Sequence, residues 1–286
     1  MVAAGRCGKR SFRRMHAWVR EFDNVRNAQR ERAKNMAVCS GYLICSAERT
    51  GSTLLADVLI GTGIAGRPRS YFNRAAHFSP SYQRILGSAK DDDGYLGRVI
   101  AAATTPNGVF AAKVHWEHFL NLVAKVDRAL SIARIPAGGP VPERLRLQFP
   151  DLRYIWLTRT NQVARAISHY RAAKTGRWQA DARWTSDDTG GEGEPEFDFD
   201  AIDSFVRLGE VEDANWRRYF RDHDVAPLEL THEEVVRDLE GAVQRILQFL
   251  GVPVENLKSR PPRLRQQSDS NSREWEARYR RMLTDE

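Results

Sequence analysis

The stretch Tyr42–Leu55, YLICSAERTGSTLL, decides the fold class. Its first five residues, Tyr42–Ser46, form a short apolar run bounded by polar residues, which is typical of a buried strand. A turn follows at 47–51. Apolar residues then recur at helical spacing, at Leu54, Leu55, Val58 and Leu59. Gly61 and Gly63 end that pattern. This order of strand, loop and helix is the opening of a phosphate-binding βα unit.

Further strands and helices alternate along the chain. Apolar runs predict strands over 109–114, 153–158 and 227–230. Helical patterns cover 162–174 and 201–220, and a third apolar helix face is formed by Val243, Ile246, Leu247 and Leu250. The predicted end signals are a cap at Thr160 or Asn161, a capping box at Thr231 and Glu234, and stops at Gly176, Gly251 and Pro253. The alternation predicts an α/β fold, a P-loop-like three-layer arrangement with a central, mainly parallel sheet flanked by helices.

Ligands of such sheets bind beyond the carboxyl ends of the strands. Three segments lie at predicted strand ends: the loop 47–53, the residues after Lys113, and the residues after Thr158. We therefore expect them to meet at one site.

The positive charge is concentrated at the N-terminus. Residues 1–37 hold ten Lys and Arg against three Asp and Glu, which accounts for the whole net charge of +7. A nucleic-acid binder needs its positive charge on the folded face, so the pattern argues against nucleic acid as a partner. We expect a basic extension over 1–37, disordered or partly helical, and one catalytic domain over 38–286. The extension is expected to be a solvated arm, with weak contact to an anionic membrane surface as the alternative.

Cysteine usage and hydropathy indicate the compartment. The three cysteines, Cys7, Cys39 and Cys45, are an odd number without metal-ligand spacing. No run approaches 18 apolar residues, and the N-terminus lacks the apolar core of a signal peptide. These features predict a cytoplasmic protein without a metal centre.

The loop between the first strand and helix has the residues that an anion site needs. A helix N-terminus presents free N–H groups, and Gly51 permits close backbone approach. Ser52 and Thr53 add hydroxyl donors, and the Arg49 guanidinium suits phosphate or sulfate. A well-capped helix after a turn is the plainer alternative. The Lys of the nucleotide loop GxxxxGK[ST] is missing before Ser52, which points to an anion that is handled without a metal.

The segment Ser46–Leu55 resembles the phosphosulfate loop of sulfotransferases, and more closely that of the Stf0 family of bacterial, trehalose-type enzymes. Further blocks that resemble this family follow in order: Thr62–Pro68, Tyr71–Phe72, Pro106–Phe110, Lys113, Trp116, Arg159, Ala166–Ser168, Tyr170–Ala172, Gly176–Trp178, Arg265–Gln267, Glu274–Trp275 and Arg278–Arg280. The resemblance runs from about residue 40 to residue 281, so only the basic extension lies outside it.

The resemblance implies a homodimeric sulfotransferase that uses 3′-phosphoadenylyl sulfate (PAPS) as donor and a carbohydrate or glycolipid hydroxyl as acceptor. It implies that the donor's 5′-phosphosulfate is held by Arg49, Thr50, Gly51, Ser52, Thr53 and Leu54. Arg159 and Ser168 match the family's 3′-phosphate pair, and Arg265 would close over the nucleotide. A surface salt bridge is the alternative for Arg159.

The catalytic base is where this sequence departs from the family. In-line sulfuryl transfer needs stabilisation of negative charge, for which Arg49 and Lys113 are candidates, and a base for the acceptor's proton. The family's base is a Glu in a Glu-Pro-x-Glu-Phe-Phe block, which reads Arg67-Pro68-Arg69-Ser70-Tyr71-Phe72 here, with Ser70 at the position of the base. We consider His115 as the replacement, with Glu48 as the second choice and a structural role for His115 as the alternative. Glu117 and His118 are expected to be solvated residues at a helix start.

The acceptor side is predicted from the same segments. Candidate acceptor-binding residues are Glu48, Arg67, Arg69, Ser70, His115 and Trp178. Because Arg67 and Arg69 make this block basic, an acidic acceptor is expected. Core packing is the alternative for Trp178.

Three other functions stay open at this point. A relative that binds PAPS or its product PAP without catalysis would explain the missing Glu. A P-loop-like kinase would share the strand, loop and helix. A membrane-surface anchor would use the basic extension.

Overall fold

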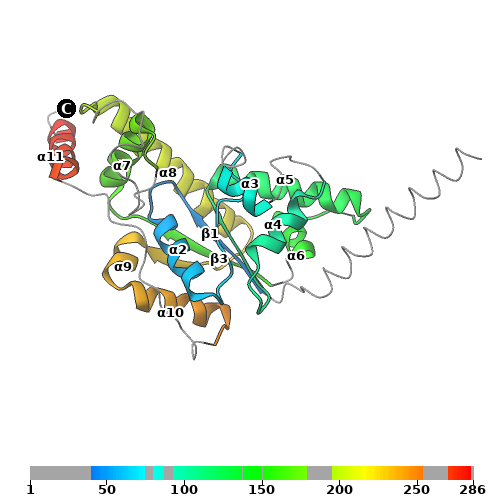
Figure 1. Ribbon diagram of the computed structural model, residues 1–286. Coiled ribbons are helices and arrows are strands. Elements are labelled where there is room, and N and C mark those ends of the chain that lie inside the picture. Colours follow the sequence, from blue (N-terminus) through cyan, green and yellow to red (C-terminus); the bar gives the residue numbers. More distant parts are fainter. Residues whose placement is uncertain are drawn as a thin grey trace, which may run out of the picture. The chain divides into compact units, whose positions relative to one another are not determined.

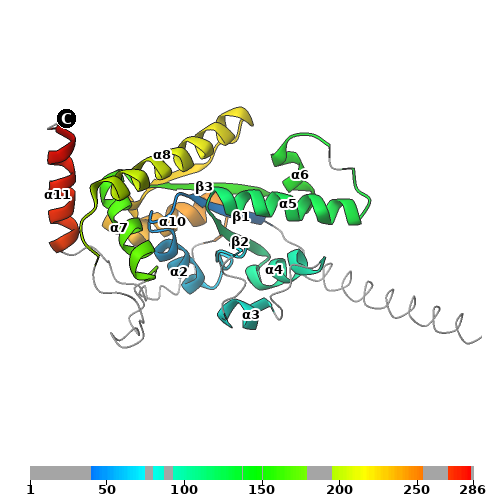
Figure 2. The same cartoon turned by 90° about the horizontal axis from the view of Figure 1, so that it is seen from above.

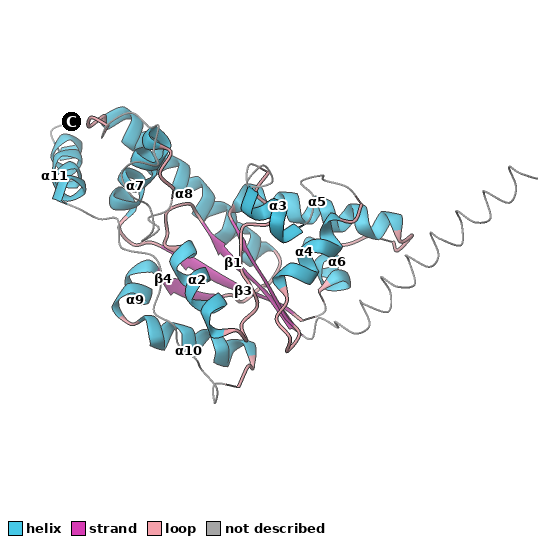
Figure 3. Cartoon of the chain, viewed as in Figure 1, coloured by secondary structure: helices cyan, strands magenta, loops and turns pink. Residues whose placement is uncertain are grey.

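The computed structural model describes residues 40–74, 80–86, 93–136, 138–149, 151–178, 195–253 and 270–284 of the chain. The strands β1 (Ser40–Ser46), β2 (Val109–Val114), β3 (Leu152–Thr158) and β4 (Leu228–Thr231) form a four-stranded sheet (Figures 1 and 3). The basic extension and Arg265 lie outside the described residues, so the expected division at residue 37 stays a prediction.

The strand order in the sheet is β2-β1-β3-β4, and every neighbouring pair is parallel. Cys45 of β1 lies opposite Val114 of β2, and Ser46 lies opposite Leu157 of β3. The chain leaves β1 to one side to form β2, then returns to the other side of β1 to form β3. This reversal makes the carboxyl end of β1 the topological switch point, where ligands of such sheets bind.

Helices cover both faces of the sheet (Figure 2). One face carries α2 (Ser52–Thr62), α9 (His232–Arg237) and α10 (Leu239–Leu250). The other carries α4 (Tyr95–Ala103), α5 (Trp116–Ile132), α6 (Val141–Gln148) and α8 (Phe199–Asp222). The remaining described helices are α3 (Pro80–Leu86), α7 (Gln162–Thr175) and α11 (Ser270–Thr284).

Alternation along β1 divides the core between these faces. Tyr42 and Ile44 pack with α2 and α10, whereas Leu43 and Cys45 pack with α5 and α8. All four side chains are fully buried. The predicted three-layer α/β fold with a parallel sheet is therefore confirmed.

A smaller cluster joins α7, α8 and α11. Tyr170, Ile202 and Tyr279 are buried in it, and the Tyr279 hydroxyl donates to Asp203 Oδ1 at 2.7 Å. This cluster fixes α7 against α8, which matters because α7 carries Ser168.

The predicted helix ends are confirmed except at Gly61, which lies inside α2. Gly63, Gly176 and Gly251 end α2, α7 and α10 in the left-handed conformation. The Asn161 side chain caps α7 by accepting a hydrogen bond from Ala164 N at 2.9 Å, and Thr231 forms its capping box with Glu234. The strand and helix bounds differ from the predicted ones by at most two residues at these elements.

The sequence reading did not predict α3, α4, α6 or α11. The first three are short, and short apolar patterns do not distinguish a helix from a loop. The segment of α11 is mostly polar, and its apolar contacts come from Trp275 and Tyr279, one helical turn apart. A helix start near Glu117 was expected, and it is the start of the long helix α5.

None of the helices in the described ranges has the length and apolar character needed to cross a membrane. Across the same residues, no group of three or more His, Cys, Asp and Glu side chains is placed to hold a metal ion.

Candidate active site

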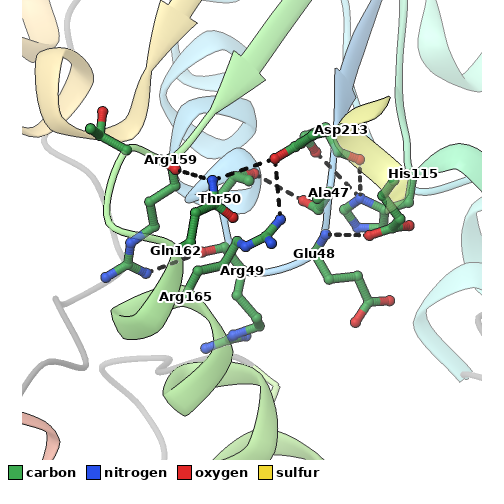
Figure 4. A network of polar contacts seen from close by, with 12 residues as sticks. Ala47, Glu48, Arg49, Thr50, His115, Arg159, Gln162, Arg165 and Asp213 are labelled. Carbon is green, nitrogen blue, oxygen red and sulfur yellow. Dashed lines mark hydrogen bonds and ion pairs between the residues drawn. The ribbon is translucent and has the colours of Figure 1, made fainter. Parts of the chain in front are cut away.

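The loop after β1 lies where the three predicted segments meet (Figure 4). Arg159, from the loop after β3, reaches it from one side, and His115, at the end of β2, lies on the other. Arg159 NH1 donates to the Arg49 carbonyl at 3.2 Å, and His115 Nδ1 lies 2.9 Å from the Ser46 carbonyl. The sheet thus brings sequence-distant polar residues to one edge.

The backbone of this loop is shaped for an anion. Arg49 and Gly51 have left-handed φ angles of 62° and 82°, and between them the Thr50 hydroxyl donates to the Ala47 carbonyl at 3.1 Å. Such conformations turn successive N–H groups toward one concave side. Gly51 is the N-cap of α2 and has no side chain with which to cap it. The first-turn N–H groups of α2, starting at Ser52, therefore have no side-chain cap and can receive an anion.

Lys113 reaches this helix end from β2. It is only 8% exposed, and its Nζ donates to Thr53 Oγ1 at 2.8 Å. Burial lowers the pKa of Lys113 to about 8, although the charge of Glu48 opposes that shift. The alternative of a solvated lysine at the strand end is therefore excluded, and an anion at the loop would favour the charged ammonium.

Two arginines, Arg49 and Arg159, place their charges on the side of the loop away from His115. Arg49 Nε donates to Ser168 Oγ at 3.0 Å, and Arg49 NH1 donates to the Trp178 carbonyl. Burial lowers the pKa of Arg49 and of Arg159, and the charge of Arg159 lowers that of Arg49 further. Arg159 Nε is buried without a hydrogen-bond partner in the described part of the chain. An anion bound here would offset the repulsion between the two cations.

The amino-acid sequence matches the Stf0 sulphotransferase family over residues 41–282. The chain belongs to the Stf0 sulfotransferase family. The matched range includes all of the sheet except Ser40, the first residue of β1, and every residue of the site described above.

Two relatives of this Stf0 protein are named as trehalose 2-sulfotransferases. It is 28% identical to the trehalose 2-sulfotransferase of Mycolicibacterium smegmatis, over 85% of this chain and 95% of that one. It is 24% identical to the trehalose 2-sulfotransferase of Mycobacterium tuberculosis, over 84% and 94% of the two chains. Among solved structures, the sulfotransferase of Alicyclobacillus acidocaldarius is similar at a TM-score of 0.45 and 16% identity, over 86% of this chain and 93% of that one.

The His115 ring of this Stf0 protein is held at the start of α5. It is 8% exposed, and burial, followed by the charge of Lys113, lowers its pKa to about 3. A neutral ring that donates from Nδ1 to the Ser46 carbonyl leaves Nε2 as a proton acceptor.

His118 was expected to be solvated, and this prediction is wrong. His118 is buried, with its ring centroid 5.0 Å from that of His115, and its Nδ1 has no partner among the described residues. Because α5 lies on the sheet, the residue one turn into the helix faces the core rather than water. Glu117 is exposed, as expected.

Glu48 is fixed by two neighbours. Its carboxylate lies 3.0 Å from His169 Nε2 of α7, and its backbone N–H donates to Glu212 Oε2 of α8 at 3.2 Å. Burial opposes ionisation of Glu48, but the His169 hydrogen bond and the nearby histidine charges outweigh it and lower its pKa. Burial raises the pKa of Glu212 to about 7, and the charge of Glu48 adds to this.

The block that departs from the family pattern runs beside β2. The Arg69 carbonyl accepts a hydrogen bond from Lys113 N of β2 at 3.0 Å. Ser70 therefore directly follows a residue that is paired with β2. The guanidinium of Arg67 points to α4 instead, where its NH1 donates to the Thr104 carbonyl at 2.6 Å. Arg67 therefore stabilises the end of a helix, and its expected role in acceptor binding stays a prediction.

Trp178 is 45% exposed, and its ring centroid lies 5.7 Å from that of His169. The alternative of core packing is therefore excluded for Trp178. Its position beside Arg49 and Glu48 keeps it among the acceptor candidates.

Sequence reasoning missed four polar residues that surround the loop. They are His169, Glu212, His232 and Glu233. The last two directly follow β4, so the rule that ligands bind at carboxyl ends of strands could have found them. Glu212 lies inside a long helix, where charged residues usually face water, and the sequence carries no signal for it.

Proposed function

We propose that this protein transfers a sulfuryl group from PAPS to a hydroxyl of a carbohydrate or glycolipid. The observation that carries the proposal is the pair of anion-binding features on either side of Arg49: the α2 N-terminus with Lys113, and Arg159 with Ser168. PAPS carries anionic groups at both ends of its ribose, so two such features suit it. The carbohydrate acceptor is inferred from the trehalose specificity named for both relatives.

The residues fit the donor in a simple way. The N–H groups and hydroxyls of 49–54 would hold the 5′-phosphosulfate, and Arg159 with Ser168 would hold the 3′-phosphate. PAPS supplies an activated sulfur whose bond to the 5′-phosphate oxygen breaks as the acceptor oxygen bonds to it. Lys113 lies beside the α2 end and would stabilise the charge that develops on the leaving phosphate. Arg265, outside the described residues, stays a candidate for closing over the nucleotide.

His115 is the residue to which we assign the acceptor's proton. Burial and Lys113 keep the ring neutral in the free protein, so Nε2 is available as a proton acceptor; the charge of Glu48, which raises the pKa of His115, would stabilise the imidazolium that forms. Glu48 is the second choice, because His169 already pairs with its carboxylate. The homodimer, the cytoplasmic location and the solvated basic extension stay predictions of the sequence.

Calorimetry of PAP, the product that PAPS leaves, tests the donor site. Wild-type protein is expected to bind PAP in EDTA and to bind ATP and ADP more weakly. Arg49→Ala should weaken PAP binding by roughly 10- to 100-fold, the loss expected for hydrogen bonds to charged groups. Arg49→Asn should lose as much, although Asn tolerates the left-handed backbone of residue 49.

Two controls sharpen this test. Arg146→Ala, on the exposed side of α6, should leave PAP affinity unchanged. Full affinity in Arg49→Asn together with loss in Arg49→Ala would assign the effect to backbone strain rather than to the guanidinium. A folded wild-type protein that does not bind PAP would contradict the proposal. Metal-dependent binding of ATP would favour the alternative of a P-loop-like kinase.

A distinct pH dependence is expected from Lys113. Because burial lowers its pKa to about 8, the ammonium is charged below that pH and loses its proton above it. PAP affinity should therefore fall as pH rises through about 8, and Lys113→Met should remove this dependence and weaken binding by about tenfold at pH 7. Lys125→Met, on α5, is the matched control. An unchanged pH profile in Lys113→Met would remove Lys113 from the donor site.

The missing family Glu favours one second candidate, a protein that binds PAP without catalysis. Ser70 lies beside β2, and its hydroxyl cannot act as the base alone at neutral pH. Tight PAP binding without transfer to any of a panel of neutral and anionic sugars would support that candidate.

A further inference from the structure

His232 contacts the loop between β1 and α2. It reaches this loop from β4, the last strand in the order β2-β1-β3-β4. It directly follows β4 and begins α9, and its ring packs on Gly51, the N-cap of α2. A Cβ added to Gly51 would overlap Nδ1 of His232. Gly51 is thus needed both for its left-handed φ and for the space that the imidazole fills.

One ring nitrogen of His232, Nδ1, makes no hydrogen bond of good geometry within the described residues. Nδ1 is buried against the loop, where it faces the backbone of Thr50 but has no partner of good geometry. A buried polar atom without a partner is uncommon and calls for a physical reason. An imidazole kept ready for a ligand at this loop is such a reason.

The charges around His232 come from two elements. Arg159 faces it from the loop after β3, and Glu233 is its neighbour on α9. The Glu233 carboxylate is already committed, because it accepts hydrogen bonds from Thr160 N at 3.0 Å and Asn161 N at 3.2 Å. From the loop before α2, the Thr50 backbone faces the ring. Burial and then the charge of Arg159 lower the pKa of His232, so the free protein holds it neutral near pH 7.

We propose that His232 is a further residue of the donor-phosphate site, and that binding of the anionic donor protonates its imidazole. This inference rests on the proposed function. His232 lies between the two features assigned to the donor, the α2 end at Gly51 and the guanidinium of Arg159. A donor phosphate there would offset the repulsion from Arg159 and favour the charged ring, which gains a charge-assisted bond.

Proton uptake on binding has a definite sign. If the complex holds one more proton than the free protein, PAP affinity rises as pH falls through the range between the two pKa values of His232. PAP itself acts in the opposite direction, because its terminal phosphates lose protons near pH 6 and bind better when ionised. The informative quantity is therefore the difference between wild type and a His232 variant.

Calorimetry in buffers of different ionisation enthalpy measures this difference. At pH 7, wild type is expected to take up more protons per PAP than His232→Gln, by up to about one proton. His232→Gln should also bind PAP about tenfold more weakly, the loss of one hydrogen bond to a charged group. His223→Gln, at the end of α8, is the matched control and should behave as wild type.

Each other outcome is decisive. Equal proton uptake and equal affinity in wild type and His232→Gln would overturn the inference while leaving the donor site intact. If proton uptake on PAP binding is lost in His115→Gln and kept in His232→Gln, the proton is taken up by His115 instead. No PAP binding by wild type would sink the donor proposal itself, and this inference with it. If His232→Gln does not fold, nitrogen NMR of histidine-labelled wild type, assigned with His232→Asn, must show that ring becoming charged on PAP addition.

Discussion

His115→Ala should lower kcat by about 10²- to 10⁴-fold, the usual contribution of a general base, while leaving PAP affinity unchanged. His115 is the residue at the end of β2 whose Nδ1 is held by the Ser46 carbonyl, so its Nε2 has one defined direction in which to accept a proton. The ring lies near Lys113 and Glu48, on the side of the loop away from Arg159. Single-turnover transfer from labelled PAPS to a carbohydrate acceptor, with PAP calorimetry beside it, measures the two effects separately.

Glu48→Gln distinguishes the two candidate bases. If His115 accepts the proton, Glu48→Gln should lose far less than His115→Ala, because it removes only a nearby charge. If Glu48 is the base, the order reverses. Near-normal turnover in His115→Ala would leave His115 with a structural role, as a ring packed against His118.

The residues that we assign to the donor could be brought together from the sequence because they lie at positions that the fold makes equivalent. Arg49, Lys113 and Arg159 each follow or end a strand, and parallel strands carry such residues to one edge. The hydrogen bonds from Arg159 to Arg49 and from Lys113 to Thr53 show that the edge is shared. The apolar runs that predict the strands, and the positions where those runs end, were sufficient to place these three residues at one edge.

The surroundings of His115 and Glu48 could not be predicted in the same way, because they depend on where the helices pack against the loop. His118 is buried and Glu212 reaches Glu48 only because α5 and α8 lie along one face of the sheet. Arg67 is a further example, because its guanidinium forms a hydrogen bond with the backbone at the end of α4. No local pattern encodes these side-chain directions, since they are set by tertiary packing.

Asp213→Ala is expected to have the largest effect on stability, about 3–5 kcal/mol, because it leaves a buried cation unpaired. Arg165 of α7 is a fully buried arginine, with its side chain 2% exposed, and Asp213 of α8 is its ion-pair partner at 3.5 Å. The Arg165 guanidinium packs on Gly209 of α8, where a Cβ would overlap it. Urea unfolding, read as a shift in midpoint at constant slope, measures the loss.

The pair is nevertheless expected to be a weak stabiliser as a whole. Burial opposes the charge of both partners, lowering the pKa of Arg165 and raising that of Asp213. The guanidinium nitrogens of Arg165 also lack well-formed hydrogen bonds within the described residues. The double variant Arg165→Met with Asp213→Leu should therefore recover most of the stability that Asp213→Ala loses, because it replaces two buried charges by apolar side chains.

The control for this comparison is the exposed pair at the end of the same helix. Arg221 and Asp222 lie 2.8 Å apart with their side chains largely in water, and Asp222→Ala should change stability by less than about 0.5 kcal/mol. A double variant as unstable as Asp213→Ala would mean that the pair is needed in its charged form. In that case Arg165 would also be holding α7, and with it Ser168, against α8 for donor binding. PAP calorimetry on the refolded double variant separates the two roles: full affinity leaves the pair a packing element, and weak affinity in a stable fold makes Arg165 a positioning residue for Ser168.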